Sequence, residues 1–192
     1  MKTLLASAAF AAAILAPSAA SAQAIPAAVV AVVDLDRVTS ECNACKTAAA
    51  TLRSQATAFQ SHRDSLASSL QTEQKSIQAA VDALKGKEPD AALQTRIKSF
   101  QAKAQQDEQE LAGQQQQIQA NQQYIQKQIA EKLAPIYQQV MQRRGANLLM
   151  EVGSTLATAQ SVDVTNDVLT ALNGSLPTIS TTAPAQPKPQ GR

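Results

Sequence analysis

Aromatic and glycine residues are scarce in this chain, which has no tryptophan, two tyrosines, three phenylalanines and six glycines in 192 residues. Aromatic side chains dominate the buried area of thick cores, so their scarcity argues against one large globular core. No glycine-rich phosphate loop is present. The single histidine, His62, has no serine and carboxylate partners in a recognisable catalytic pattern. We therefore expect no enzymatic activity, no catalytic residues, no metal site and no cofactor.

Charge of one sign is also not in excess. The net charge is +2, whereas nucleic-acid binding usually requires a clearly basic face. Removing an N-terminal segment that contains Lys2 leaves 17 − 1 = 16 basic residues against 15 acidic ones. We expect no nucleic-acid partner.

The N-terminus has the pattern of a secretory signal peptide over residues 1–22. Lys2 precedes an apolar run that ends before Pro17, and the small residues Ala20-Ser21-Ala22 form an A-x-A cleavage site. Cleavage is expected after Ala22, with Ala24 as the alternative. No later stretch is long and apolar enough to predict a transmembrane helix. The sequence therefore predicts a periplasmic protein that is secreted across the inner membrane.

Two helical runs over residues 46–143 predict an antiparallel α-helical hairpin. Gly86 and Pro89 lie in the break near residues 85–90, where glycine favours the end of a helix and proline disfavours its continuation. Heptad spacing gives each helix one apolar seam, and the short connection makes the seams face each other. The seam residues are Leu52, Phe59 and Leu66 in the first run, and Ile97, Ala104, Leu111, Ile118 and Ile125 in the second.

The second run is polar beside its seam. Its neighbouring heptad line continues from Leu93 and Phe100 into Asp107, Gln114 and Asn121. Residues 101–128 include 13 glutamines, yet the regular apolar spacing favours folded helix over low-complexity sequence. A seam this narrow predicts an arm that projects from the rest of the protein.

The remaining segments, 23–45 and 144–174, predict a small β-rich body, which makes the fold class α+β. Val29–Val33 and residues 147–152 have the pattern of buried strands, and 155–160 is a weaker strand candidate. Residues 163–172 predict a short helix. The Pro-rich tail, 175–192, has the composition of a disordered segment.

Such a small body has open strand edges and little core, so we expect copies of the chain to complete a barrel together. Three copies are the simplest solution. The residues predicted to build this shared body are Val30, Val32, Leu148, Met150 and Val152.

Cys42 and Cys45 form a C-x-x-C pair with three interpretations. A redox-active pair would normally lie in a thioredoxin-like βαβ unit, which this sequence lacks. A zinc site would need two further ligands. The favoured interpretation is a local disulfide or two small apolar residues near the first turns of the arm.

The order of these segments resembles the Skp/OmpH-like family of periplasmic chaperones, over nearly the whole mature chain to Leu172. The similar stretches are Val30 to Asp34, Leu133 to Tyr137, Asn147 to Glu151 and Asp163 to Leu169. The resemblance implies a homotrimer with a barrel body and three helical arms around a cavity. It also implies ATP-independent binding of unfolded outer-membrane proteins, near a membrane surface but without a transmembrane segment. The inward faces of Leu52 to Leu84 and Leu93 to Ile129 would then form the client cavity.

One departure from the family concerns charge, because its well-studied members are strongly basic. Between Leu84 and Lys103, five basic residues stand against Glu88 and Asp90, a local charge of +3. We expect electrostatic attraction of clients to concentrate at this arm tip, although the same residues also suit an ordinary solvated helix end. The basic residues are Lys85, Lys87, Arg96, Lys98 and Lys103.

Two other functions remain compatible with the residues. A coiled-coil interaction protein of the cell envelope would bind one partner tightly instead of many weakly. An oxidoreductase would depend on Cys42 and Cys45.

Overall fold

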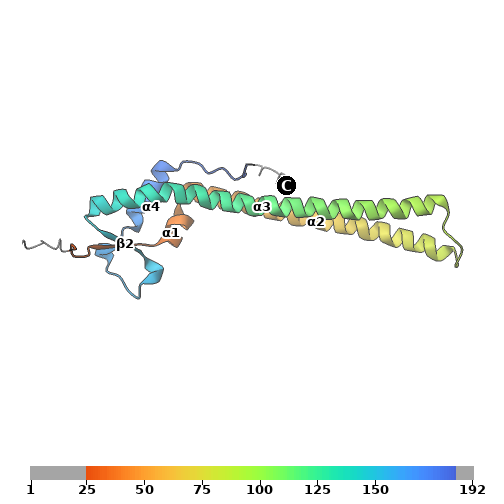
Figure 1. Ribbon diagram of the computed structural model, residues 1–192, viewed down its shortest axis with the longest axis horizontal. Helices are drawn as coiled ribbons and strands as arrows, with labels where there is room; N and C mark the ends of the chain where they lie inside the picture. The colour runs from red at the N-terminus through yellow and green to blue at the C-terminus, as the bar shows by residue number, and fades with distance from the viewer. Residues whose placement is uncertain (1–24, 185–192) are drawn as a thin grey trace, which may run out of the picture.

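A long helical hairpin projects from a small body in the computed structural model, which describes residues 25–184 (Figure 1). The predicted signal peptide and the last eight residues of the tail lie outside the described residues. The elements in chain order are β1 (Val30–Val33), α1 (Leu35–Glu41), α2 (Asn43–Ala83), α3 (Ala91–Arg144), β2 (Leu148–Glu151), the 3₁₀ turns η1 (Val152–Ser154) and η2 (Gln160–Val162), and α4 (Thr165–Ser175).

The predicted hairpin is confirmed, with α2 of 41 residues and α3 of 54 residues as its two helices. At 1.5 Å per residue they extend roughly 60 Å and 80 Å. Asp90 caps α3, since its carboxylate accepts a hydrogen bond of 2.8 Å from the N–H of Leu93. The longer helix continues through Pro135 into the body.

The tip is a tight turn in which two successive residues take left-handed backbone angles. Lys85 has φ 48° and Gly86 has φ 90°. Glycine at the second position avoids the steric cost that a side chain would meet there. Gly145, with φ 66°, ends α3 at the other end in the same way.

The helical pattern of the sequence continues through Val38 into the first arm, but the structure interrupts the helix at Cys42. Asp34 caps α1, because its carboxylate accepts a hydrogen bond of 2.8 Å from the N–H of Arg37. Cys42 has ψ 128°, which is not helical, and α2 begins at Asn43. The N–H of Asn43 donates to the side chain of Asn173 at 2.9 Å. This contact with α4, distant in sequence, satisfies the free N–H at the start of α2.

The body contains one parallel pair of strands, in which Val30 faces Leu148 and Val33 faces Glu151. An isolated bridge joins Val32 to Asp163 on the other side of β1. The predicted strand at 155–160 is wrong. Residues 152–162 instead form two 3₁₀ turns and irregular chain, because β2 pairs with one edge of β1 and Asp163 bridges to the other, which leaves β1 no edge for a third strand.

The core lies where α1, the start of α2, the end of α3 and α4 meet beside β1. Its apolar side chains interlock, and Val38, Val140, Val168 and Leu172 are wholly buried. Hydrogen bonds add to this packing: the N–H of Asp34 donates to Thr165 at 2.9 Å, and Arg144 pairs with Asp167 at 2.7 Å. The segments that precede and follow the arm in the sequence thus pack into one core.

Residues 176–184 differ from the predicted disordered tail. Leu176 is buried in the body core and Ile179 packs against it. The chain then follows the arm in an extended conformation, lying beside α3 (Figure 1). Composition pointed to disorder because these residues have few apolar side chains, whereas the observed order comes from contacts with glutamine and asparagine side chains of the hairpin.

Candidate functional site

A groove of about 770 Å³ lies on the middle of the arm, between α2 and α3. Most of its large apolar side chains come from the predicted seams of both helices, which shows that the two seams face each other. These side chains are only half-buried: Phe59, Leu66 and Leu70 from α2, and Ala104, Leu111 and Ile118 from α3. A narrow seam therefore leaves apolar surface accessible along the hairpin.

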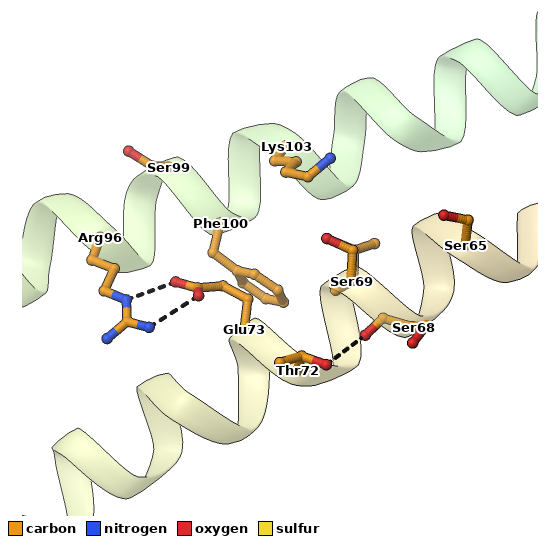
Figure 2. Close-up of a pocket in the computed structure, with 10 residues that line it drawn as sticks. Ser65, Ser68, Ser69, Thr72, Glu73, Arg96, Ser99, Phe100 and Lys103 are labelled. Atoms are coloured by element: carbon orange, nitrogen blue, oxygen red, sulfur yellow. Dashed lines mark hydrogen bonds and ion pairs between the residues drawn. The ribbon is translucent and has the colours of Figure 1, made fainter. Parts of the chain in front are cut away.

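A second groove of about 720 Å³ lies closer to the tip and is more polar (Figure 2). The ring of Phe100 extends from α3 toward α2 at its centre, and Leu70 belongs to both grooves. Five hydroxyl side chains also line this groove: Ser65, Ser68, Ser69, Thr72 and Ser99. The surface thus changes from apolar to mixed along the arm.

Arg96 joins the two helices at the end of this second groove. Its guanidinium donates to both carboxylate oxygens of Glu73, at 2.6 and 2.9 Å (Figure 2). It also donates to the hydroxyl of Ser76 at 2.7 Å. The hydrogen bond from Arg96 lowers the pKa of Glu73, and the same bond raises the pKa of Arg96. The sequence pattern did not identify Glu73 as a partner of the arm tip. Its carboxylate neutralises the charge of Arg96, one of the predicted basic residues.

The other predicted basic residues of the tip fall into two groups. Lys85, Lys87 and Lys98 are exposed. Lys103 instead binds Asp107, with its ammonium 2.9 and 3.1 Å from the two carboxylate oxygens. Positive charge available to a partner is therefore concentrated in the turn and on Lys98.

The two cysteines are joined in a disulfide, with their Cα atoms 5.1 Å apart. It spans the break between α1 and α2, and both residues are buried in the body core. Within residues 25–184 no group of histidine, cysteine and carboxylate side chains has the arrangement of a metal site. The cysteine pair therefore packs as part of the body core.

The residues predicted to build a shared body differ in accessibility. Leu148 exposes 42% of its surface, while Val32 exposes 3% because it packs inside the chain itself. Val30 and Met150 are half-buried, and Val152 lies in η1 instead of a strand. Val29 and Leu156 are also exposed on the body. An apolar contact with another copy would thus involve the exposed side chains of Leu148, Val29 and Leu156 more than Val32.

Comparison with protein families gives a match over residues 29–172 to the model described as outer membrane protein (OmpH-like). The matched residues include both strands, the whole hairpin and most of α4. The chain belongs to the OmpH-like family.

Among solved structures, the OmpH-like chain is similar to a protein of Caulobacter crescentus that is described as a candidate outer membrane chaperone (OmpH-like). The identity is 20% and the TM-score 0.69, over 87% of this chain and 96% of that one. The likeness shows that the two share a fold. A comparison with curated proteins gave no match. In the part of the OmpH-like chain that the structure describes, no helix is long and apolar enough to cross a membrane.

Four amide side chains of the OmpH-like arm also hold the C-terminal segment, residues 177–184, a role that the sequence does not predict. They are Gln55, Gln117, Asn121 and Gln128. Asn121 and Gln128 are seven residues apart on the polar heptad line of the second helix. That spacing was the available signal, but nothing in the sequence showed what these side chains contact.

Proposed function

We propose that this OmpH-like chain is an ATP-independent holdase of the periplasm, which binds unfolded outer-membrane proteins along its arms and prevents their aggregation. The observation that carries the proposal is the half-exposed apolar groove between α2 and α3. An unfolded barrel protein exposes apolar side chains and unpaired strand edges, which aggregate in water. A long surface of partly exposed apolar residues can cover such segments without selecting one sequence.

The proposal includes a homotrimer, in which three arms surround the client. The body of one chain offers β2 with one neighbouring strand among the described residues, and Leu148 lies exposed on it. Pairing of this edge with another copy would satisfy its backbone and cover Leu148. Enclosure between three arms would then keep client molecules apart.

The proposed periplasmic location follows from the signal pattern of residues 1–22 and from family membership. The exposed lysines of the tip, Lys85, Lys87 and Lys98, would attract acidic clients over roughly a Debye length, about 8 Å at physiological salt. Because Arg96 is paired with Glu73, this attraction is weaker than a count of the sequence suggests.

Light scattering tests the holdase function. An outer-membrane β-barrel protein is diluted from urea with and without this chain, which should suppress the scattering near one trimer per client. Leu66→Gln with Leu111→Gln should weaken the suppression, because both side chains line the apolar groove. Val81→Gln is the matched control, since Val81 is an exposed apolar residue of α2 away from both grooves. Unchanged aggregation with the wild-type chain would refute the function.

Sedimentation equilibrium tests the trimer separately. The wild-type chain should have three times the mass of one chain, and Leu148→Lys should shift it toward the single chain, since burying an unpaired ammonium is costly. A wild-type chain of single mass at micromolar concentration would contradict the trimer while leaving the holdase assay to decide the rest.

A further inference from the structure

The extended C-terminal segment, residues 177–184, lies along the hairpin. Side chains of the hairpin hold it by hydrogen bonds to the segment's backbone. The side-chain amide of Gln128 pairs with both backbone polar groups of Ser180, accepting from its N–H at 3.0 Å and donating to its carbonyl at 2.9 Å. This two-point contact has the donor and acceptor pattern that a neighbouring β-strand would offer.

The next contacts lie one heptad closer to the tip. The N–H of Ala183 donates to the side-chain oxygen of Asn121 at 2.8 Å, and Gln117 donates to the carbonyl of Ala183 at 3.4 Å. Gln55 of the facing helix donates to the carbonyl of Thr181 at 3.4 Å. The segment's side chains take no part in these bonds, so the amides of the hairpin recognise a backbone and not a sequence.

Three of these amides, Gln55, Gln117 and Asn121, also hold one another in place. Asn121, which is 4% exposed, donates to Gln55 at 3.0 Å and accepts from Gln117 at 2.8 Å. A buried amide fixed on two sides loses little further freedom when it binds a chain. We call Gln55, Gln117, Asn121 and Gln128 the amide row.

The spacing of the row matches any extended polypeptide. Asn121 and Gln128 are seven helical residues apart, which is about 10.5 Å along the axis. Ser180 and Ala183 are three residues apart, which is roughly 10 Å in an extended chain. The register therefore depends on the helix and strand repeats and not on the composition of the segment.

A further groove of about 410 Å³ opens beside the same residues. Gln55, Gln117 and Asn121 line it together with the apolar side chains of Phe59 and Ile118. A chain lying on the row would thus have apolar surface within reach, as an unfolded client requires.

We propose that the amide row is a sequence-independent site for the backbone of an extended polypeptide, and that residues 177–184 occupy it as an intramolecular competitor of unfolded clients. This inference rests on the proposed holdase function. The client would replace the segment at Gln128 and Asn121, using the N–H and C=O groups of its own extended stretches. The segment would thereby lower the apparent affinity of the arm for a client.

Hydrogen exchange on the full chain tests the displacement. The N–H groups of Ser180 and Ala183 should exchange slowly in the free protein and faster when an unfolded barrel protein is bound. Slow exchange that persists with the client bound would overturn the inference while leaving the holdase function intact. Failure to hold any client would instead remove the proposed function.

Two proline variants separate the segment from the row. Ser180→Pro and Ala183→Pro each remove an N–H that bonds to the hairpin, without altering the hairpin itself. Each should raise client affinity by about two- to tenfold, the worth of one or two net hydrogen bonds. Thr182→Pro is the matched control, because the contacts of the row are with Ser180, Thr181 and Ala183. Unchanged affinity in the first two variants would count against competition.

A substitution in the amide row itself should lower client affinity instead of raising it. Gln128→Met keeps the length of the side chain but cannot bond a backbone, so it should release the segment and also weaken client binding by about two- to tenfold. Circular dichroism checks that the helix is retained. Stronger client binding in this variant would show that the row serves only the segment.

A synthetic peptide of residues 177–184 tests backbone recognition without any client. Added to the Ser180→Pro chain, it should shift the side-chain amide resonance of Gln128 at about millimolar concentration. The same peptide with N-methyl groups at positions 180 and 183 should give no shift. Equal shifts from both peptides would refute recognition through the main chain, whatever the outcome of the holdase assay.

Discussion

The body and the arm of this chain bury different kinds of residue. In the body, Val38, Val140, Val168 and Leu172 have no exposed surface. Along the arm, between residues 49 and 124, the two buried residues are the polar Asp107 and Asn121, while the apolar seam stays half-exposed. Burial of apolar area is the main source of stability. The body therefore stabilises the fold, whereas the arm keeps its apolar surface available for contacts.

Equal truncations in the two regions should have unequal effects. Leu172→Ala in the body should cost about 2–5 kcal/mol of unfolding free energy, because it leaves a cavity in a closed core. Leu66→Ala on the arm should cost about 1 kcal/mol, since that side chain is already half-exposed. Urea unfolding at one fixed protein concentration measures both. Equal losses would show that the arm is as closely packed as the body.

The disulfide should also act on the body. Cys42→Ala with Cys45→Ala should lower the unfolding free energy by about 2 kcal/mol, the entropic effect expected for so short a loop. Both cysteines are buried, so a reductant should reach the disulfide only after the body opens. The measurement compares urea midpoints of the wild-type chain and the variant, together with the rate of reduction in dithiothreitol. Rapid reduction of the folded chain would contradict this placement.

Acid should weaken the body through Asp163. Hydrogen bonds from the hydroxyl and the N–H of Thr165 lower the pKa of Asp163 below its usual value. A lowered folded-state pKa means that this stabilisation is present above the unfolded-state pKa, near 4, and is lost as pH falls through the folded-state value. The thermal midpoint should thus fall modestly as the pH is lowered from 6 to 3. Asp163→Asn should reduce this fall, since asparagine keeps a hydrogen-bond acceptor without titrating. The same slope in both proteins would exclude Asp163 as its source.

The smallest effect on stability is expected at the arm tip. Glu73→Gln removes the partner charge of Arg96 but should leave the thermal midpoint unchanged, because the pair is exposed. Association with an acidic client should become about twofold faster at low salt, and the difference should vanish in high salt. Stopped-flow fluorescence at two ionic strengths measures it. A lowered midpoint would show that the pair stabilises the hairpin.

Local signals made the arm predictable, and long-range contacts made parts of the body unpredictable. The heptad repeat is read directly along each helix of the arm. Gly86 and Asp90 likewise lie at the turn and the helix start that they determine. The break at Cys42 depends on Asn173, and the end of β2 depends on where β1 stops. No periodicity in the sequence records such pairings.

The candidate site divides in the same way. The apolar seams that line the middle groove were visible as repeats, whereas the pairing of Arg96 with Glu73 depends on how the two helices align. The C-terminal segment is a further case, because polar composition alone predicts disorder unless a polar partner for the backbone is known.

The parallel pairing of Val30 with Leu148 also has a consequence for the order of folding. A chain made from its N-terminus completes the first strand long before the second, so early intermediates carry an unmatched β1. Closing so long a loop directly is entropically slow, but a helical hairpin nucleated at Gly86 brings its two ends together. Substitutions that delay this turn should therefore slow completion of a body some 60 Å away.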